Sequence, residues 1–180
     1  DAAVHFLVGG TQTNLTVITA LLASYEAVIA AHTGHVNCHE TGAIEATGHK
    51  VCTAYSPDGK VTPEMVESVL AIHADGEEHM VAPKLVYISD TTEIGTVYTK
   101  AELTALRQCC DAHDLLLFLD GARLGSALTS PENDLTLSDL AALTDVFTIG
   151  GTKNGALFGE AVIMTVPCDH FRWHIKQRGG

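Results

Sequence analysis

Short apolar runs alternate along the chain with segments whose apolar residues recur every three or four positions. The run at 115–119 is wholly apolar, as in a strand covered on both faces. Helix starts are marked by Thr62-Pro63 and by the Thr99/Glu102 capping box. We expect strands at 5–8, 27–31, 50–55, 84–89, 115–119, 146–149 and 161–166, and helices at 15–25, 41–47, 62–74, 99–113 and 137–143 and from Asp169.

Strands that alternate with helices predict an α/β domain with a mostly parallel sheet and helices on both faces, which gives three layers. With 180 residues, 46% hydrophobic and 18% charged, one folded domain is expected. The net charge of −12 argues against nucleic-acid and anionic-membrane partners. Five cysteines without CxxC spacing indicate free thiols, and we expect a cytoplasmic protein.

Polar groups follow the apolar runs at five places, namely Gly10-Thr11, His35, Asp90, Asp120 and Lys153. Ligands of parallel α/β sheets gather at the carboxyl ends of the strands. These five positions therefore predict one binding site rather than scattered surface polarity.

Two of these stretches allow more than one interpretation. The Gly9-Gly10-Thr11 turn is either a tight turn capped by a threonine or an anion site at a helix N-terminus. The His32–Glu40 segment is either a metal site, a surface cluster, or the source of an imidazole, His35, that stacks on a flat ring. Because no second ligand cluster is visible, we assign no metal ligands.

Asp120 follows the most apolar strand, so its carboxylate needs a cationic or hydrogen-bonding partner. That partner is either Arg123, in a structural ion pair, or the ring nitrogen of a pyridine cofactor. In the second case Lys153 is the amine that reacts with the cofactor aldehyde, and Gly10-Thr11 holds a phosphate. Together these groups describe a pyridoxal phosphate site.

Three separated segments, 39–50, 120–125 and 149–156, resemble the low-specificity threonine aldolase and β-eliminating lyase family. That family has the aspartate aminotransferase fold, which is fold type I of the pyridoxal phosphate enzymes. The resemblance implies that Lys153 bonds to the cofactor aldehyde, Asp120 contacts the pyridine nitrogen and His35 stacks on the ring. It implies Gly10 and Thr11 as phosphate ligands.

Other roles also follow from the resemblance. Arg123 would contact the cofactor and the substrate carboxylate, and Thr152 would contact the cofactor. Asp90 and Thr92 would lie near the cofactor, and Lys176 and Arg178 would reach a phosphate across a subunit interface.

The resemblance implies an enzyme that cleaves L-threonine or L-allo-threonine to glycine and an aldehyde, with Lys153, His35 and Asp120 as catalytic residues. The alternatives are β-elimination or transamination of another amino acid, and a non-catalytic metal-binding module. We expect residues 1–180 to be part of the large domain of a homodimer or homotetramer. A segment with a substrate-binding serine and a small C-terminal domain of the family lie outside this chain.

Overall fold

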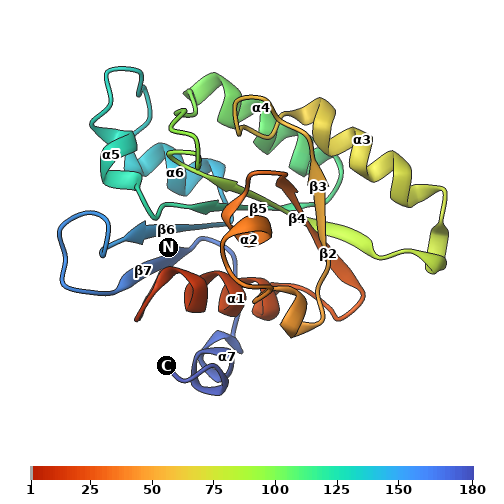
Figure 1. Cartoon of the computed structure of the whole chain (residues 1–180), viewed down its shortest axis with the longest axis horizontal. Coiled ribbons are helices and arrows are strands. Elements are labelled where there is room, and N and C mark those ends of the chain that lie inside the picture. The colour runs from red at the N-terminus through yellow and green to blue at the C-terminus, as the bar shows by residue number, and fades with distance from the viewer. Residues whose placement is uncertain (1) are drawn as a thin grey trace.

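The computed structural model describes residues 2–180, without the side chain of Glu77. One seven-stranded sheet runs through it in the order β1-β7-β6-β5-β4-β2-β3 (Figure 1). The strands are β1 (Ala3–Leu7), β2 (Glu26–Ala31), β3 (Val51–Ala54), β4 (Ala82–Ser89), β5 (Leu116–Asp120), β6 (Val146–Gly150) and β7 (Glu160–Met164). The helices are α1 (Gly10–Leu21), α2 (His35–Cys38), α3 (Pro63–Ala74), α4 (Lys100–Ala112), α5 (Leu124–Leu128), α6 (Leu137–Leu143) and α7 (Phe171–Gln177), with 3-10 turns at Glu45–Thr47 and Glu77–His79.

The expectation of a mostly parallel sheet is confirmed. β2, β3, β4, β5 and β6 pair in parallel, whereas β7 pairs antiparallel with both β6 and β1. The carboxyl ends of the five parallel strands therefore meet at one edge of the sheet. The start of β7 reaches the same edge, because Glu160 pairs with Gly150 at the end of β6.

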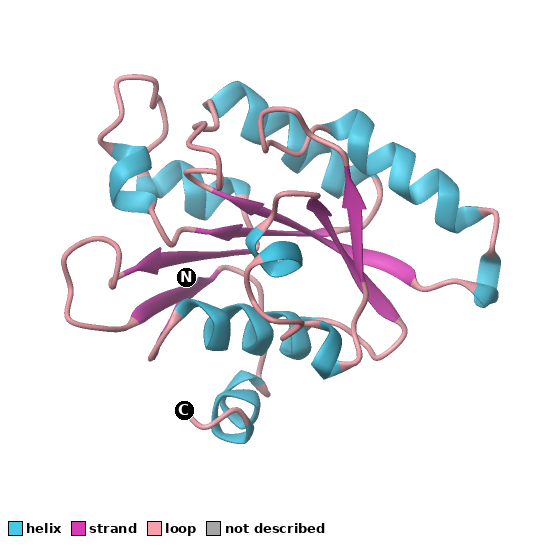
Figure 2. Cartoon of the chain, viewed as in Figure 1, coloured by secondary structure: helices cyan, strands magenta, loops and turns pink. Residues whose placement is uncertain are grey.

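Helices cover both faces of the sheet, which gives the three expected layers (Figure 2). α1 and α7 pack on one face against alternate strand residues such as Tyr87 and Phe118. α3, α4, α5 and α6 pack on the other face against residues such as Ile88 and Leu119. Successive strand residues point to opposite faces, so neighbours in sequence enter different cores.

Helix boundaries follow the capping residues. Thr62 caps α3 by accepting a hydrogen bond from the N–H of Met65, and Pro63 is its first residue. Thr99 forms the predicted capping box with Glu102 at the start of α4. By contrast, the N-cap of α1 is Gly9, which makes no side-chain hydrogen bond, and the first turn of α1 holds no acidic residue.

The structure differs from the sequence-based prediction in the short elements. The expected helix at 41–47 is only a 3-10 turn over Glu45–Thr47, because Thr41 and Gly42 have positive φ angles of 54° and 71°. α2 and α5 were not predicted, since four or five residues carry too little periodicity. In the described part of the chain, no helix combines the length and the apolar character needed to cross a membrane.

Candidate active site

Asp120 is 5% exposed at the end of β5, and its carboxylate receives three hydrogen bonds. Oδ2 accepts from the hydroxyl of Tyr87 at 2.5 Å and from the amide Nδ2 of Asn14 at 2.9 Å. Oδ1 accepts from the backbone N–H of Ala122 at 2.8 Å. Burial, together with the negative charge of Asp120, raises the pKa of Tyr87 far above its usual range, so Tyr87 remains a donor.

The same amide of Asn14 links Asp120 to a second buried carboxylate, Glu40. Asn14 Nδ2 donates to Glu40 Oε1 at 2.7 Å, and Nδ1 of His35 lies 2.8 Å from the same oxygen. A carboxylate oxygen can only accept, so Nδ1 of His35 carries the hydrogen of this bond. In the neutral imidazole Nε2 is then the nitrogen that can accept a proton. A continuous chain of polar contacts therefore runs from His35 through Glu40 and Asn14 to Asp120.

His35 is held at its backbone as well as at its ring. Its N–H donates to Glu93 Oε1 at 2.9 Å, and the hydroxyl of Ser89 donates to the same oxygen at 2.7 Å. The hydrogen bond to Glu40 raises the pKa of His35, burial lowers it, the charges of Glu40 and Asp120 raise it, and the charge of Lys153 lowers it. The net result is an imidazole whose pKa lies above its ordinary value.

Lys153 lies in the loop between β6 and β7, with its side chain exposed. The next residue, Asn154, donates its side-chain amide to the carbonyl oxygens of Gly150 at 2.7 Å and Ala122 at 3.1 Å. Ala122 is two residues beyond Asp120, so this contact fixes the lysine loop beside the Asp120 turn. Both Asp120 and Lys153 are near enough to His35 to influence its pKa, which the charge of Asp120 raises and the charge of Lys153 lowers.

Glycines allow this close approach of the two loops. A Cβ atom on Gly121 would lie 1.9 Å from the carbonyl oxygen of Thr148, and one on Gly150 would lie 2.6 Å from the backbone of Ala122. The N–H of Gly121 donates to the Thr148 hydroxyl at 2.8 Å. Any side chain at position 121 or 150 would push the Asp120 turn and the lysine loop apart.

Glu160 is a third buried carboxylate at this edge of the sheet. Burial raises its pKa, the charge of Asp120 raises it further, and the Thr152 hydroxyl and the charge of Lys153 lower it. Thr152 donates to Glu160 Oε1 at 3.3 Å. This hydrogen bond ties the loop that carries Thr152 and Lys153 to Glu160 at the start of β7.

The Gly9-Gly10 turn leaves room in front of the first turn of α1. A Cβ atom built on Gly9 or Gly10 would meet no heavy atom within 4 Å. Thr11 is exposed at the same helix end. The start of a twelve-residue helix thus has free space beside its two glycines, as is expected for an anion site.

Arg123 follows the Asp120 turn as the N-cap of α5 and is half-buried. Within residues 2–180 it forms no ion pair with Asp120, whose donors are all uncharged. The structural Asp120–Arg123 pair that the sequence allowed is therefore wrong.

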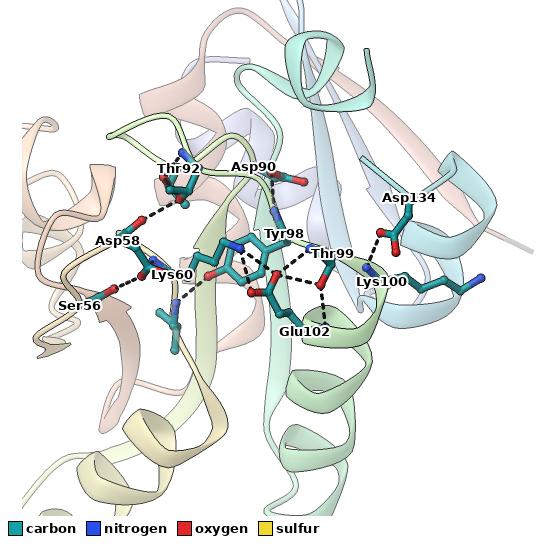
Figure 3. A network of polar contacts seen from close by, with 12 residues as sticks. Ser56, Asp58, Lys60, Asp90, Thr92, Tyr98, Thr99, Lys100, Glu102 and Asp134 are labelled. Atoms are coloured by element: carbon teal, nitrogen blue, oxygen red, sulfur yellow. Dashed lines mark hydrogen bonds and ion pairs between the residues drawn. The ribbon is translucent and has the colours of Figure 1, made fainter. Parts of the chain in front are cut away.

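Two residues suggested by the resemblance lie outside this group. Asp90 follows Ser89 on β4 and its carboxyl points to the opposite face, where Oδ1 accepts from the N–H of Tyr98 at 3.4 Å (Figure 3). Thr92 bonds to Thr96 at 2.7 Å in the same outer loop. Burial raises the pKa of Asp90 to about 6.

The histidine-rich segment does not gather its side chains around one point. His32 Nδ1 accepts from the N–H of Ser56, and Cys38 donates to the carbonyl oxygen of His32. Glu67, Cys109 and His113 do lie within 4.8 Å of one another, but on α3 and α4 and not in this segment. All five cysteines are free, as predicted.

Lys176 and Arg178 belong to the end of α7, and the carbonyl oxygen of Arg178 accepts from the amide of Gln12 at 3.0 Å. The end of α7 is thereby tied to the first turn of α1. Lys176 itself is exposed.

Several members of the site could not be assigned from sequence. Asn14 and Tyr87 lie inside a helix and a strand whose periodic patterns only indicate burial. Glu93 and Glu160 carry no motif around them. One sign was available, since a buried tyrosine needs a hydrogen-bond partner and Tyr87 lies in an otherwise apolar strand.

The fold and the match to a family model identify the class of protein to which the chain belongs. The chain has the fold of aspartate aminotransferase, since a Thermus thermophilus mutant of that enzyme superimposes with a TM-score of 0.73 at 18% identity, over 97% of this chain and 46% of the other. The expected fold type I architecture is thus confirmed. The chain belongs to the β-eliminating lyase family, whose model matches residues 1–179.

Individual relatives are similar over nearly the whole chain. The low specificity L-threonine aldolase of Pseudomonas sp. (strain NCIMB 10558) is 37% identical and matches 99% of this chain and 52% of its own length. That of Pseudomonas aeruginosa is 34% identical, with the same shares. The solved structure of Leishmania major threonine aldolase has a TM-score of 0.97 and 58% identity, over 99% of this chain and 52% of the other. The chain spans about half the length of these relatives.

Proposed function

We propose that this chain is the cofactor-binding part of a pyridoxal phosphate-dependent lyase that cleaves L-threonine or L-allo-threonine to glycine and acetaldehyde. The relatives named threonine aldolase support the reaction. The observation that carries the proposal is the meeting of Lys153, Asp120 and His35 at one edge of the sheet. The contact of Asn154 with Ala122 fixes the Lys153 loop beside the Asp120 turn. The contacts of Asn14 and Glu40 join Asp120 to His35.

The residues present fit the cofactor. A carboxylate held by uncharged donors, Asp120, suits a protonated ring nitrogen, and an exposed amine, Lys153, suits the aldehyde. The open helix end at Gly10 and Thr11 suits the phosphate. Thr152 precedes Lys153 in its loop, and Arg123 follows the Asp120 turn. The imidazole of His35 suits the ring face.

When bound, the cofactor supplies an electron-poor ring that accepts the electrons of the breaking Cα–Cβ bond. Asp120 keeps a proton on the ring nitrogen, which maintains that electron demand. Arg123 binds the carboxylate of the amino acid and orients it. The contact between Asn154 and Ala122 holds the loop that carries Lys153 beside the Asp120 turn.

In this proposal His35 takes the proton from the substrate hydroxyl. Because Nδ1 donates to Glu40, Nε2 of the neutral ring is the atom that accepts. Glu40 then stabilises the imidazolium that forms, as a buried carboxylate does for a histidine base. This assignment gives Glu40 an electrostatic part in the reaction that the sequence motif did not define.

We further propose a cytoplasmic homodimer or homotetramer. Five free thiols support a reducing compartment. Leu157 and Phe158, which are 91% and 65% exposed in the Lys153 loop, support a partner subunit over the site.

Replacement of the reactive amine tests the proposal. Lys153→Ala should abolish the visible absorbance band of bound cofactor and lower turnover by at least about 10³-fold, while Lys50→Ala, which alters an exposed lysine elsewhere, should change neither. Borohydride reduction of the wild type should attach a pyridoxyl group to the peptide that contains Lys153.

Product analysis separates the reactions. Glycine and acetaldehyde in equal amounts from L-threonine support the lyase proposed here, whereas 2-oxobutanoate and ammonia would indicate β-elimination. Full cofactor binding and turnover in Lys153→Ala would refute the proposal.

A further inference from the structure

Asn14 occupies an unusual position, because its side-chain amide lies between two buried carboxylates. Glu40 and Asp120 are 4% and 5% exposed, and Asn14 itself is 1% exposed. Nδ2 lies 2.7 Å from Glu40 Oε1 and 2.9 Å from Asp120 Oδ2. The opposite amide orientation would set a carbonyl oxygen against both carboxylates, so the two N–H groups must point this way.

Glu40 depends strongly on this amide. Its Oε1 receives both the Asn14 amide and the His35 ring, while its Oε2 is buried without a hydrogen-bond partner in the described part of the chain. Asn14 therefore provides one of two contacts for the whole carboxylate. A buried charge that loses one of two donors is strongly destabilised.

Asp120 depends on Asn14 less, because Tyr87 and the Ala122 N–H also bond to it. These two donors do not reach Glu40 or His35. Ser89 lies 3.4 Å from the Tyr87 hydroxyl, but its single hydrogen is used in the shorter 2.7 Å bond to Glu93. Asn14 is thus the direct hydrogen-bonded link between the Asp120 side and the His35–Glu40 side.

We propose that Asn14 is a positioning residue that holds two like-charged carboxylates together and thereby fixes His35 relative to Asp120. The amide supplies one hydrogen to each carboxylate and so offsets their mutual repulsion. For the reaction this inference rests on the proposed function, because it sets the base and the partner of the ring nitrogen in one frame. The hydrogen-bonded frame itself is present without any ligand.

The test uses stability as a function of pH, which needs no cofactor. Asn14→Leu keeps the size of the side chain but removes both hydrogens, so the amide no longer offsets the repulsion between Glu40 and Asp120. Protonated His35, which bonds to Glu40, offsets part of that repulsion at low pH. The loss of Tm relative to wild type should therefore be greater at pH 8 than at pH 5.5, by roughly 4 °C. Thr16→Val changes another buried polar residue of α1, whose hydroxyl bonds only to Gln12 in its own helix, and should show the same loss at both pH values.

A second substitution makes the test specific. Glu40→Gln removes one of the two charges, so when added to Asn14→Leu it should restore part of the Tm at pH 8. Measured against Glu40→Gln alone, Asn14→Leu should then cost the same at pH 5.5 and at pH 8. If Asn14→Leu does not fold, Asn14→Ser keeps one hydroxyl hydrogen and should show about half of the effect. Equal losses at both pH values, with no restoration by Glu40→Gln, would reduce Asn14 to a packing residue and overturn the proposal.

The cofactor gives an independent second reading. In protein loaded with pyridoxal phosphate, Asn14→Leu should shift the pH at which the visible band changes, and Thr16→Val should not. If wild-type protein forms no such band, the proposed function fails, while the stability experiment still decides the role of Asn14. A band with the same pH profile in both variants would contradict the positioning role.

Discussion

At the scale of single residues, the Glu40 carboxylate controls the charge of His35. The hydrogen bond to Glu40 is the largest influence on the raised pKa of His35. Glu40→Gln should lower that pKa, because the substitution removes both the charge-assisted hydrogen bond and the negative charge. The measurement is an NMR titration of the imidazole, with Glu45→Gln, an exposed glutamate in the nearby 3-10 turn, as the control that leaves it unchanged.

The effect of this substitution on stability has a defined sign. A histidine with a raised pKa stabilises the fold below its unfolded pKa, and that contribution is lost as pH rises through the folded pKa. Glu40→Gln should therefore cost more stability at pH 5.5 than at pH 9. A loss that grows with pH would contradict the His35–Glu40 pairing.

Asp90 illustrates the opposite cost of burial. Burial raises its pKa to about 6, above the value of an unfolded aspartate, so stability falls as pH rises from about 4 to 6. Asp90→Asn keeps an acceptor for the Tyr98 N–H and should stabilise the protein by roughly 1–3 kcal/mol at pH 8, with little change at pH 4.

The comparison variant for this prediction is Asp58→Asn. The N–H of Lys60 lowers the pKa of Asp58, and Ser56 also bonds to it (Figure 3). That carboxylate contributes stability above its unfolded pKa, so its replacement should destabilise at pH 7 and not at pH 3. Thermal unfolding of Asp90→Asn and Asp58→Asn between pH 3 and pH 8 measures whether each substitution stabilises or destabilises the protein.

At the scale of elements, two glycine positions have opposite requirements. Gly121→Ala would place a methyl group against the Thr148 carbonyl and should destabilise the protein by about 3 kcal/mol or more. Gly10→Ala, at the open start of α1, should leave stability unchanged or raise it slightly, because alanine favours helix. It should nevertheless weaken cofactor binding, since the methyl group occupies the space before the helix end.

Urea unfolding and cofactor titration measure the two properties separately. Stable protein from Gly121→Ala would show that the two loops can separate without cost. Unchanged cofactor affinity in Gly10→Ala would remove this helix end as the phosphate site.

The elements themselves were largely predictable where local chemistry decides. Pro63 and the Thr99/Glu102 box set the starts of α3 and α4, and the 137–143 helix was predicted with its observed bounds. The reversed direction of β7 was not predicted, because an apolar run has the same pattern in either direction. It follows from tertiary pairing with β1 and β6.

At the scale of the molecule, the sequence placed polar residues at strand ends but not on a particular face. Asp90 and Asp120 both end apolar strands, yet only Asp120 faces α1, because Ser89 and not Asp90 is its partner in the β4–β5 register. Lys153 and Asp120 were predicted as site residues from motifs and strand ends. Asn14 was not found, since its role exists only once α1 packs beside two loops far away in sequence.

The exposed apolar tip of the Lys153 loop leads to a prediction about assembly. Leu157→Ser combined with Phe158→Ser should shift the protein toward a smaller species in sedimentation and lower its activity. Ile72→Ser, at a 63% exposed position on α3, should do neither. An unchanged sedimentation profile in the double variant would exclude this loop as a subunit contact.

The hydrogen bonds around Gly159 join the two ends of the candidate site. Its N–H donates to Val8, the residue before the Gly9-Gly10 turn, and its carbonyl oxygen accepts from Gly151, two residues before Lys153. In the proposed function, the anchor for the phosphate and the anchor for the aldehyde are thus fixed to one residue, Gly159. The distance between these two anchors is therefore fixed. Cofactor analogues whose phosphate arm is one bond longer or shorter should bind poorly, because their phosphate and aldehyde cannot reach both anchors at once.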